Sequence, residues 1–126
     1  MNLIEILKAH SSKVGQGQSI KKVHDLEARL NIDLPQDFTD YLIGLNYAEI
    51  FDDPIYGINP EIKRLDIYEQ NKHKEHFKFG FLEVFSNDTD GTVYIRPDTG
   101  NVYNASFSMP IAKSFTEFVA NVIKEA

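Results

Sequence analysis

The stretch 20-IKKVHDLEARLNIDLPQDFTDYLIGL-45 decides the fold, because two apolar stripes at helical spacing lie on either side of a short joint. Pro35 fits the first position of a second helix, since proline fixes φ and has no N–H to donate. The stretch therefore predicts a helix pair that turns at the joint. The first stripe consists of Ile20, Val23, Leu26 and Leu30, and the second of Phe38, Tyr41, Leu42 and Leu45.

Shorter elements flank the pair. Residues 3–7 are mostly apolar and predict a short first helix, and two glycines in 15–18 predict a flexible connector. Ser19 has the side chain expected at the N-cap of the pair's first helix. Residues 48–58 lack the helical period and fit an irregular strand region with a turn. One helix is expected within 62–76.

The second half changes to short β-branched and aromatic runs, at residues 81–85, 92–96 and 101–105. Gly91 and Gly100 supply the positive φ that tight hairpins need. These runs predict an antiparallel meander, followed by a helix on which Ser114 and Glu117 have the spacing of a capping box. We predict an α+β fold in which the antiparallel meander packs with the N-terminal helix pair and a C-terminal helix.

The chain has 126 residues, a length at which one core can form. We expect one domain over 1–126, with the first helix and connector in 1–18. There are no cysteines, which excludes disulfides, thiolate metal sites and cysteine nucleophiles. Glu5 interrupts the first apolar stretch and no basic leader precedes it, so we expect no secretory signal and no membrane span. These features predict a cytoplasmic protein.

The formal net charge is −6, from 13 Lys+Arg against 19 Asp+Glu. This balance disfavours direct nucleic-acid binding, which needs a basic footprint, and favours a basic partner. The charges are unevenly spread: residues 46–62 hold four acids and no Lys or Arg, whereas residues 72–78 hold three lysines and two histidines. An acidic surface region is one interpretation, and charges that only solvate loops are the other.

Weak motifs follow the helix pair in one order along most of the chain. They are 66-DIYEQN-71, 87-NDTDG-91, 99-TGNVY-103 and 111-IAKSFTEF-118. This order resembles the SUKH superfamily, which includes bacterial toxin-immunity proteins and a yeast cell-wall assembly regulator. The resemblance implies an α+β binding domain without catalytic machinery, commonly an immunity protein that covers a toxin, often a nuclease. The chain departs from many members where 46-NYA-48 replaces Asn-Gly-Gly.

Asp88 and Asp90 before Gly91 have the opening spacing of a calcium loop. The twelfth position of that loop is Pro97 instead of a bidentate carboxylate, and strands are expected on both sides, so a structural hairpin is favoured.

His73 and His76 would share a helical face, but a third zinc ligand at proper spacing is not evident. A solvated basic face beside Lys72 and Lys74 is favoured. Because the sequence also lacks hydrolase motifs, we expect no metal, no cofactor and no catalysis.

Two interpretations stay open for other residues. Glu27 borders the buried stripe, where its carboxylate needs a partner, and acceptance of backbone N–H groups from a nearby turn is favoured over a ligand role. Tyr47, Phe51 and Tyr56 stand among acids, and they are either aromatic anchors of an interface with an anionic rim or core residues.

The resemblance, together with the acidic charge balance, favours an immunity protein that binds and occludes a cognate basic toxin domain, with acids that steer a cationic surface into place. The alternatives are a regulatory or scaffold domain of the same superfamily with an endogenous partner, and a small-molecule-binding or enzymatic domain. No catalytic residue and no contact with a membrane is expected. The candidate partner-binding residues are Glu49, Asp52, Asp53, Tyr56, Asp88 and Asp90.

Overall fold

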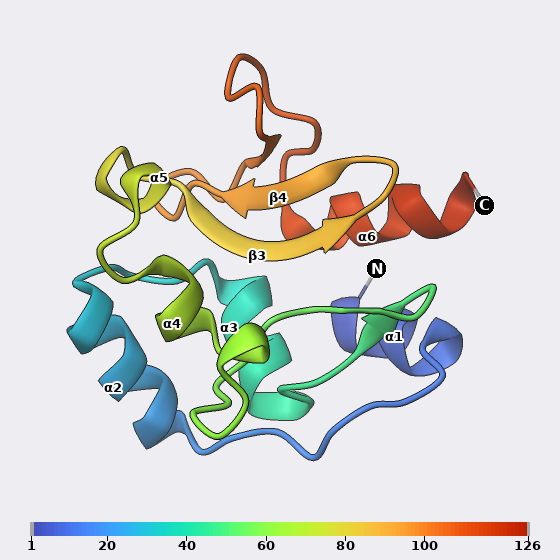
Figure 1. Cartoon of the computed structure of the whole chain (residues 1–126). Helices are drawn as coiled ribbons and strands as arrows, with labels where there is room; N and C mark the ends of the chain where they lie inside the picture. The colour runs from blue at the N-terminus through green and yellow to red at the C-terminus, as the bar shows by residue number, and fades with distance from the viewer. Residues whose placement is uncertain (1, 126) are drawn as a thin grey trace.

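The meander of the second half forms a three-stranded antiparallel sheet in the order β3-β4-β5, and a separate hairpin, β1-β2, precedes it in the chain (Figure 1). The computed structural model describes residues 2–125. Its strands are β1 (Glu49–Ile50), β2 (Asp53–Pro54), β3 (Leu82–Asn87), β4 (Gly91–Ile95) and β5 (Val102–Asn104). Its helices are α1 (Leu3–His10), α2 (Ile20–Leu30), α3 (Gln36–Gly44), the 3-10 helix η1 (Lys63–Leu65), α4 (Ile67–Asn71), α5 (Glu75–Lys78) and α6 (Phe115–Lys124). This arrangement confirms the predicted α+β fold.

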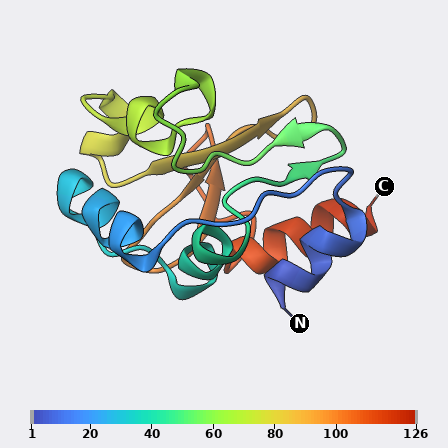
Figure 2. The ribbon, with the colours of Figure 1, turned by 90° about the horizontal axis from the view of Figure 1, so that it is seen from below.

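The core lies between one face of the three-stranded sheet and the helices. Val93 and Ile95 of β4 are fully buried in this core, while Tyr94 between them points to the opposite face, as alternation along a strand requires. Helices α1 and α6 lie side by side near the two ends of the chain (Figure 2). Asp37 at the start of α3 accepts bonds from the N–H (3.0 Å) and hydroxyl (2.8 Å) of Thr116, which joins α3 to α6.

The helix pair is confirmed as α2 and α3. Both stripes are buried except Ile20, which is 57% exposed, so its assignment to the buried stripe is wrong. Pro35 is the N-cap of α3 and not its first helical residue. Glu27 accepts a hydrogen bond from the backbone N–H of Leu34 at 2.8 Å, which confirms the structural interpretation of this carboxylate and closes the joint.

The segment before α2 is hydrogen-bonded along its length to the end of α3. The N–H of Gly15 donates to Tyr47 O and that of Gly17 to Leu45 O, both at 2.9 Å. A Cβ on Gly15 would lie 2.5 Å from Leu45 O, and one on Gly17 would clash with Ile43 O. The glycines that suggest a flexible connector therefore permit a close approach of two backbones.

Asn46 adopts a left-handed conformation, with φ of 58°, at the start of the stretch 46-NYA-48. Its side chain accepts a bond from Ile58 N (2.8 Å) and donates one to Ile58 O (3.0 Å). Asparagine tolerates this conformation better than most residues. Tyr47 and Ala48, which stand in place of the two glycines, have no positive φ, so the turn does not need glycine there.

The helix expected within 62–76 is broken into η1, α4 and α5. Asp66 caps α4 by accepting the N–H of Glu69 at 3.1 Å, as its position predicts. His73 has a positive φ of 61° between α4 and α5, so it does not share a helical face with His76. His76 is partly buried against the ring of Tyr94, so the prediction of a solvated basic face is wrong for this residue.

The terminal helix begins at its predicted N-cap. Ser114 accepts the N–H of Glu117 at 3.0 Å. The Glu117 carboxylate accepts the N–H of Lys113, one residue before the position that a capping box uses. Phe115, Phe118 and Val119 are buried, which confirms the apolar face.

Asn71 is a fully buried polar residue that joins three elements. Its Nδ2 donates to Ile67 O in α4 (2.8 Å) and to Glu83 O in β3 (2.9 Å). Its Oδ1 accepts the N–H of Glu83 (2.7 Å) and shares a hydrogen bond with His76 Nε2 in α5 (3.0 Å). Every donor and acceptor of the amide is therefore used, as a buried polar group requires.

Replacement of this amide is expected to be costly. Asn71→Ala leaves the N–H and C=O of Glu83 without these partners, and we expect the free energy of unfolding to fall by about 3 kcal/mol. Urea denaturation followed by circular dichroism measures the change. The matched control is Asn121→Ala on the exposed side of α6, with an expected change within about 0.5 kcal/mol. Equal effects of the two substitutions would contradict this role.

Candidate protein-binding surface

The β1-β2 hairpin has a strained tip. Phe51 and Asp52 both have left-handed backbones, with φ of 50° and 71°, as the two-residue turns that match strand twist require. Glycine and asparagine are the usual residues at such positions, and a side chain like that of Phe51 costs roughly 1–2 kcal/mol there. Phe51 is 55% exposed, so more than half of its surface stays in contact with solvent. An exposed aromatic group held at this strain is a candidate contact for a partner.

The β3-β4 hairpin presents a second acidic tip. Asn87 Oδ1 accepts the N–H of Asp90 at 2.6 Å, and Asn87 Nδ2 donates to Asp90 Oδ2 at 3.1 Å. Gly91, the first residue of β4, follows with a φ of 73°. The strands on both sides confirm the prediction of a structural hairpin at this sequence.

The two hairpins meet because β2 lies next to β3. The N–H of Tyr56, just after β2, donates to Val84 O at 2.9 Å. A cleft of about 380 Å³ separates the two tips and reaches the end of α6. Its apolar walls include Ile50, Phe51 and Val122, and its acidic groups are Asp53, Asp88, Asp90 and Glu125.

The acids of this cleft repel one another. Burial, followed by the charges of Asp88 and Asp52, raises the pKa of the Asp53 carboxyl above its usual value. Among residues 2–125, none of the cleft carboxylates forms a salt bridge with Lys, Arg or His. Their negative charge is therefore uncompensated within the described part of the chain, which favours a cationic ligand.

The structure brings together four of the six predicted partner-binding residues. Asp53, Asp88 and Asp90 line the cleft, and Asp52 is exposed at the adjoining tip. Glu49 and Tyr56 do not line it. Glu49 accepts bonds from the hydroxyls of Ser12 and Tyr47, which hold its pKa below the usual value.

Tyr56 is also engaged within the protein. It is partly buried, and its hydroxyl donates to Glu83 Oε2 at 2.7 Å. Tyr47, Phe51 and Tyr56 are predicted to be either interface anchors or core residues. Phe51 is the most exposed of the three, whereas Tyr56 packs against the core. Sequence reasoning missed Glu125, because no pattern indicates which end of the terminal helix meets the hairpins.

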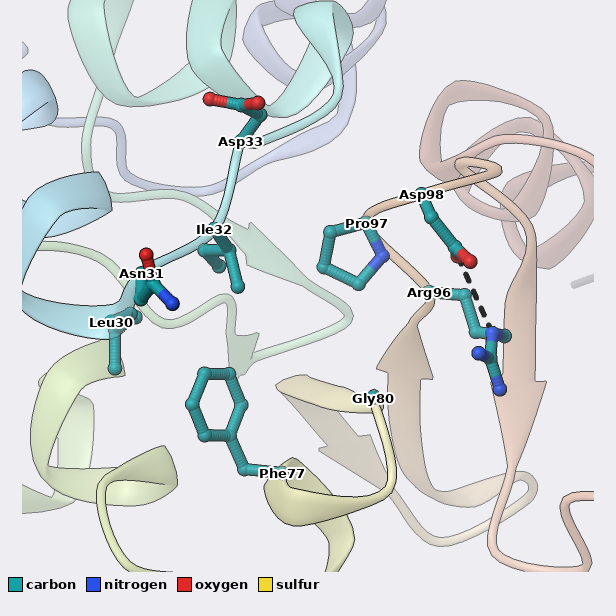
Figure 3. Close-up of a pocket in the computed structure, with 9 residues that line it drawn as sticks. All are labelled: Leu30, Asn31, Ile32, Asp33, Phe77, Gly80, Arg96, Pro97 and Asp98. Atoms are coloured by element: carbon teal, nitrogen blue, oxygen red, sulfur yellow. Dashed lines mark hydrogen bonds and ion pairs between the residues drawn. The ribbon is translucent and has the colours of Figure 1, made fainter.

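A second hollow, of about 560 Å³, lies open to solvent between the α2-α3 joint, α5 and the β4-β5 turn (Figure 3). Leu30, Ile32, Phe77 and Pro97 provide its apolar lining. Arg96 lies at its edge with Nε 3.4 Å from Asp98 Oδ1. The predicted small-molecule alternative calls for a deep pocket with converging polar groups, and this open groove does not have that form.

Residues 18–121 match the family model described as SMI1 / KNR4 family (SUKH-1). The chain belongs to this family, which confirms the resemblance seen in the sequence. Family members are generally non-enzymatic immunity or regulatory proteins that act through protein–protein interaction. No curated protein matches the chain. Within residues 2–125, no helix combines the length and apolar character needed to cross a bilayer.

The strained tip allows a test of its cost. Phe51→Asn with Asp52→Gly supplies residues suited to the same turn, and we expect the free energy of unfolding to rise by about 1 kcal/mol. A thermal melt then shifts upward by a few degrees, on the order of 3 °C. Phe51→Leu keeps the backbone strain and serves as the control, and we expect little change in its free energy of unfolding. A double variant less stable than the parent protein would show that the ring contributes packing.

The burial of Asp53, together with repulsion from Asp88 and Asp52, predicts a pH dependence of stability. Since the folded state raises this pKa, ionised Asp53 destabilises the fold above that pKa, and the penalty disappears as pH falls below the unfolded value of about 3.9. Asp53→Asn should therefore unfold at higher urea concentration than the parent protein at pH 7. The difference should shrink towards pH 3.5. Asp25→Asn, on the exposed side of α2, is the control, and a pH-independent gain for Asp53→Asn would exclude a raised pKa of Asp53.

Proposed function

We propose that the protein is an immunity protein. It binds a cognate toxin domain that has a basic surface, and it blocks that domain by occlusion. The observation that carries the proposal is the meeting of two acidic hairpin tips in one cleft without an internal cation among residues 2–125. Family membership supports a binding role. The proposal includes one domain over 1–126 and a cytoplasmic location, and it needs no chemistry on a substrate.

The cleft suits a long cationic side chain from the toxin. Such a side chain has an apolar stem and a charged head, and the cleft offers apolar walls next to carboxylates. Phe51, exposed at the rim, adds an aromatic contact of the kind that dominates many interfaces. Long-range attraction between a basic toxin surface and a chain of net charge −6 raises the rate of encounter.

Co-expression tests the proposal directly. A bacterial host carries the toxin domain encoded beside this gene under an inducible promoter, with or without the protein. We expect survival and co-purification of a complex when both are expressed. Growth arrest despite a folded, soluble protein, or the absence of a toxin gene at the locus, would refute the immunity role.

Charge reversal tests the cleft as the binding site. Asp52→Lys with Asp88→Lys should slow association with that toxin by roughly tenfold or more at low ionic strength, because steering is lost. Stopped-flow fluorescence measures the rate, and the difference should narrow as salt is added. The control is Asp25→Lys with Glu61→Lys, which makes the same change of charge at exposed residues outside the cleft. Equal slowing in both pairs would assign the effect to net charge alone.

The alternative is a regulatory or scaffold domain with an endogenous partner, because the family takes in regulatory as well as immunity proteins. This alternative also relies on binding by the acidic cleft, but the partner is then a protein other than a toxin. Loss of the gene would then change a host process in cells that lack any cognate toxin.

A further inference from the structure

An aromatic cluster lies on the sheet face opposite the core. Phe81, Tyr94, Tyr103 and Phe107 form it, with ring centroids 4.4 Å apart for Phe81 and Phe107 and 4.8 Å apart for Tyr94 and Phe107. Tyr103 is 5.2 Å from Phe81. None of the four belongs to the main core between the sheet and the helices. The four rings therefore form a separate small apolar cluster, in which Phe81 and Tyr94 are buried and Phe107, in the loop that follows β5, is exposed.

Large apolar side chains border this cluster in the open. Phe79 is 66% exposed and precedes Gly80, on which a Cβ would lie 3.2 Å from Nη2 of Arg96. Met109, in the same loop as Phe107, is 73% exposed. Phe107 itself is 36% exposed and has a left-handed φ of 56°. Single exposed apolar residues are ordinary, but several beside one aromatic cluster mark an interaction surface.

Arg96 gives this surface its charge. Its guanidinium lies 4.9 Å from the centre of the Phe81 ring, where a cation is attracted to the ring face. Asp98 contacts only Nε, at 3.4 Å, and its side chain is 66% exposed, so this pair is weak. Within residues 2–125, neither Nη atom donates a hydrogen bond. A guanidinium fixed on a ring with free Nη groups matches the fork of a carboxylate.

We propose that this surface binds a peptide segment of a partner protein in which an acidic side chain stands beside an aromatic or large aliphatic one. Arg96 receives the carboxylate, and Phe79, Phe107 and Met109 receive the apolar side chain. The charge complementarity is opposite to that of the acidic cleft, so the two surfaces select different ligands. This inference does not depend on the proposed immunity role.

A stack of nucleic-acid bases fits the surface less well. Sheet aromatics that bind bases expose their ring faces. Here Phe81 and Tyr94 are only 9% and 7% exposed and lie under Phe107, and the chain has a net charge of −6. The peptide is therefore the favoured ligand.

The test is an NMR titration of the ¹⁵N-labelled full chain with capped peptides of equal length, GSEFDSG and GSKFKSG, and with oligouridylate RNA. We expect the acidic peptide to shift the amide resonances of Phe79, Gly80, Arg96 and Phe107, and the basic peptide to leave them in place. Shifts confined to the Asp52 and Asp88 tips, no shifts at millimolar acidic peptide, or equal shifts with the RNA would overturn the proposal.

Variants separate recognition from folding. Arg96→Gln should weaken binding of the acidic peptide by about tenfold, and Phe79→Ser by a similar factor. Arg96→Lys keeps the charge but loses the planar pair of donors. Its affinity for the acidic peptide should therefore lie between those of the parent protein and Arg96→Gln. Lys124→Gln, at the exposed end of α6, is the matched control and should bind as the parent does. Unchanged affinity in folded Arg96→Gln and Phe79→Ser would refute the assignment.

Discussion

The amide of Asn71 is the interaction on which the rest of the arrangement depends. It lies where α4 ends and β3 begins, and it is bonded to both elements as well as to His76 in α5. Because Asn71 fixes the backbone of Glu83, the Glu83 carboxylate is placed to accept the hydroxyl of Tyr56. Tyr56 in turn bonds β3 through its N–H, and this contact holds the first hairpin against the sheet. One buried side chain thus helps to fix the part of β3 against which the first hairpin packs.

Much of the fold follows from local patterns in the sequence. The stripes of α2 and α3 predict the pair, and the position of Glu27 beside a buried stripe predicts the bond to the joint, because a carboxylate there needs a donor. Ser19 and Ser114 mark helix starts by the same logic, since their hydroxyls satisfy free N–H groups. These features depend on residues close together in the chain.

Other features depend on residues that are distant in the chain, and no local pattern encodes them. In the sequence, Asn71 resembles any polar residue of a helix, and only its contact with β3 shows its role. Ile20 has the spacing of a core residue, although it lies at the exposed first turn of α2. The hairpin tips at residues 51–52 and 88–90 are each recognisable as turns. Their meeting results from the packing of β2 on β3, which the sequence does not express.

The exposure of Asp52 and Asp88 at turn tips has an evolutionary consequence. Neither carboxylate takes part in the main core or in a salt bridge among the described residues. Under the proposed binding role, substitutions at these two positions would alter partner preference while the core stays intact, provided that the residue at position 52 accepts a left-handed backbone. On this proposal, a lineage can diversify recognition at the two tips and inherit the same interior unchanged.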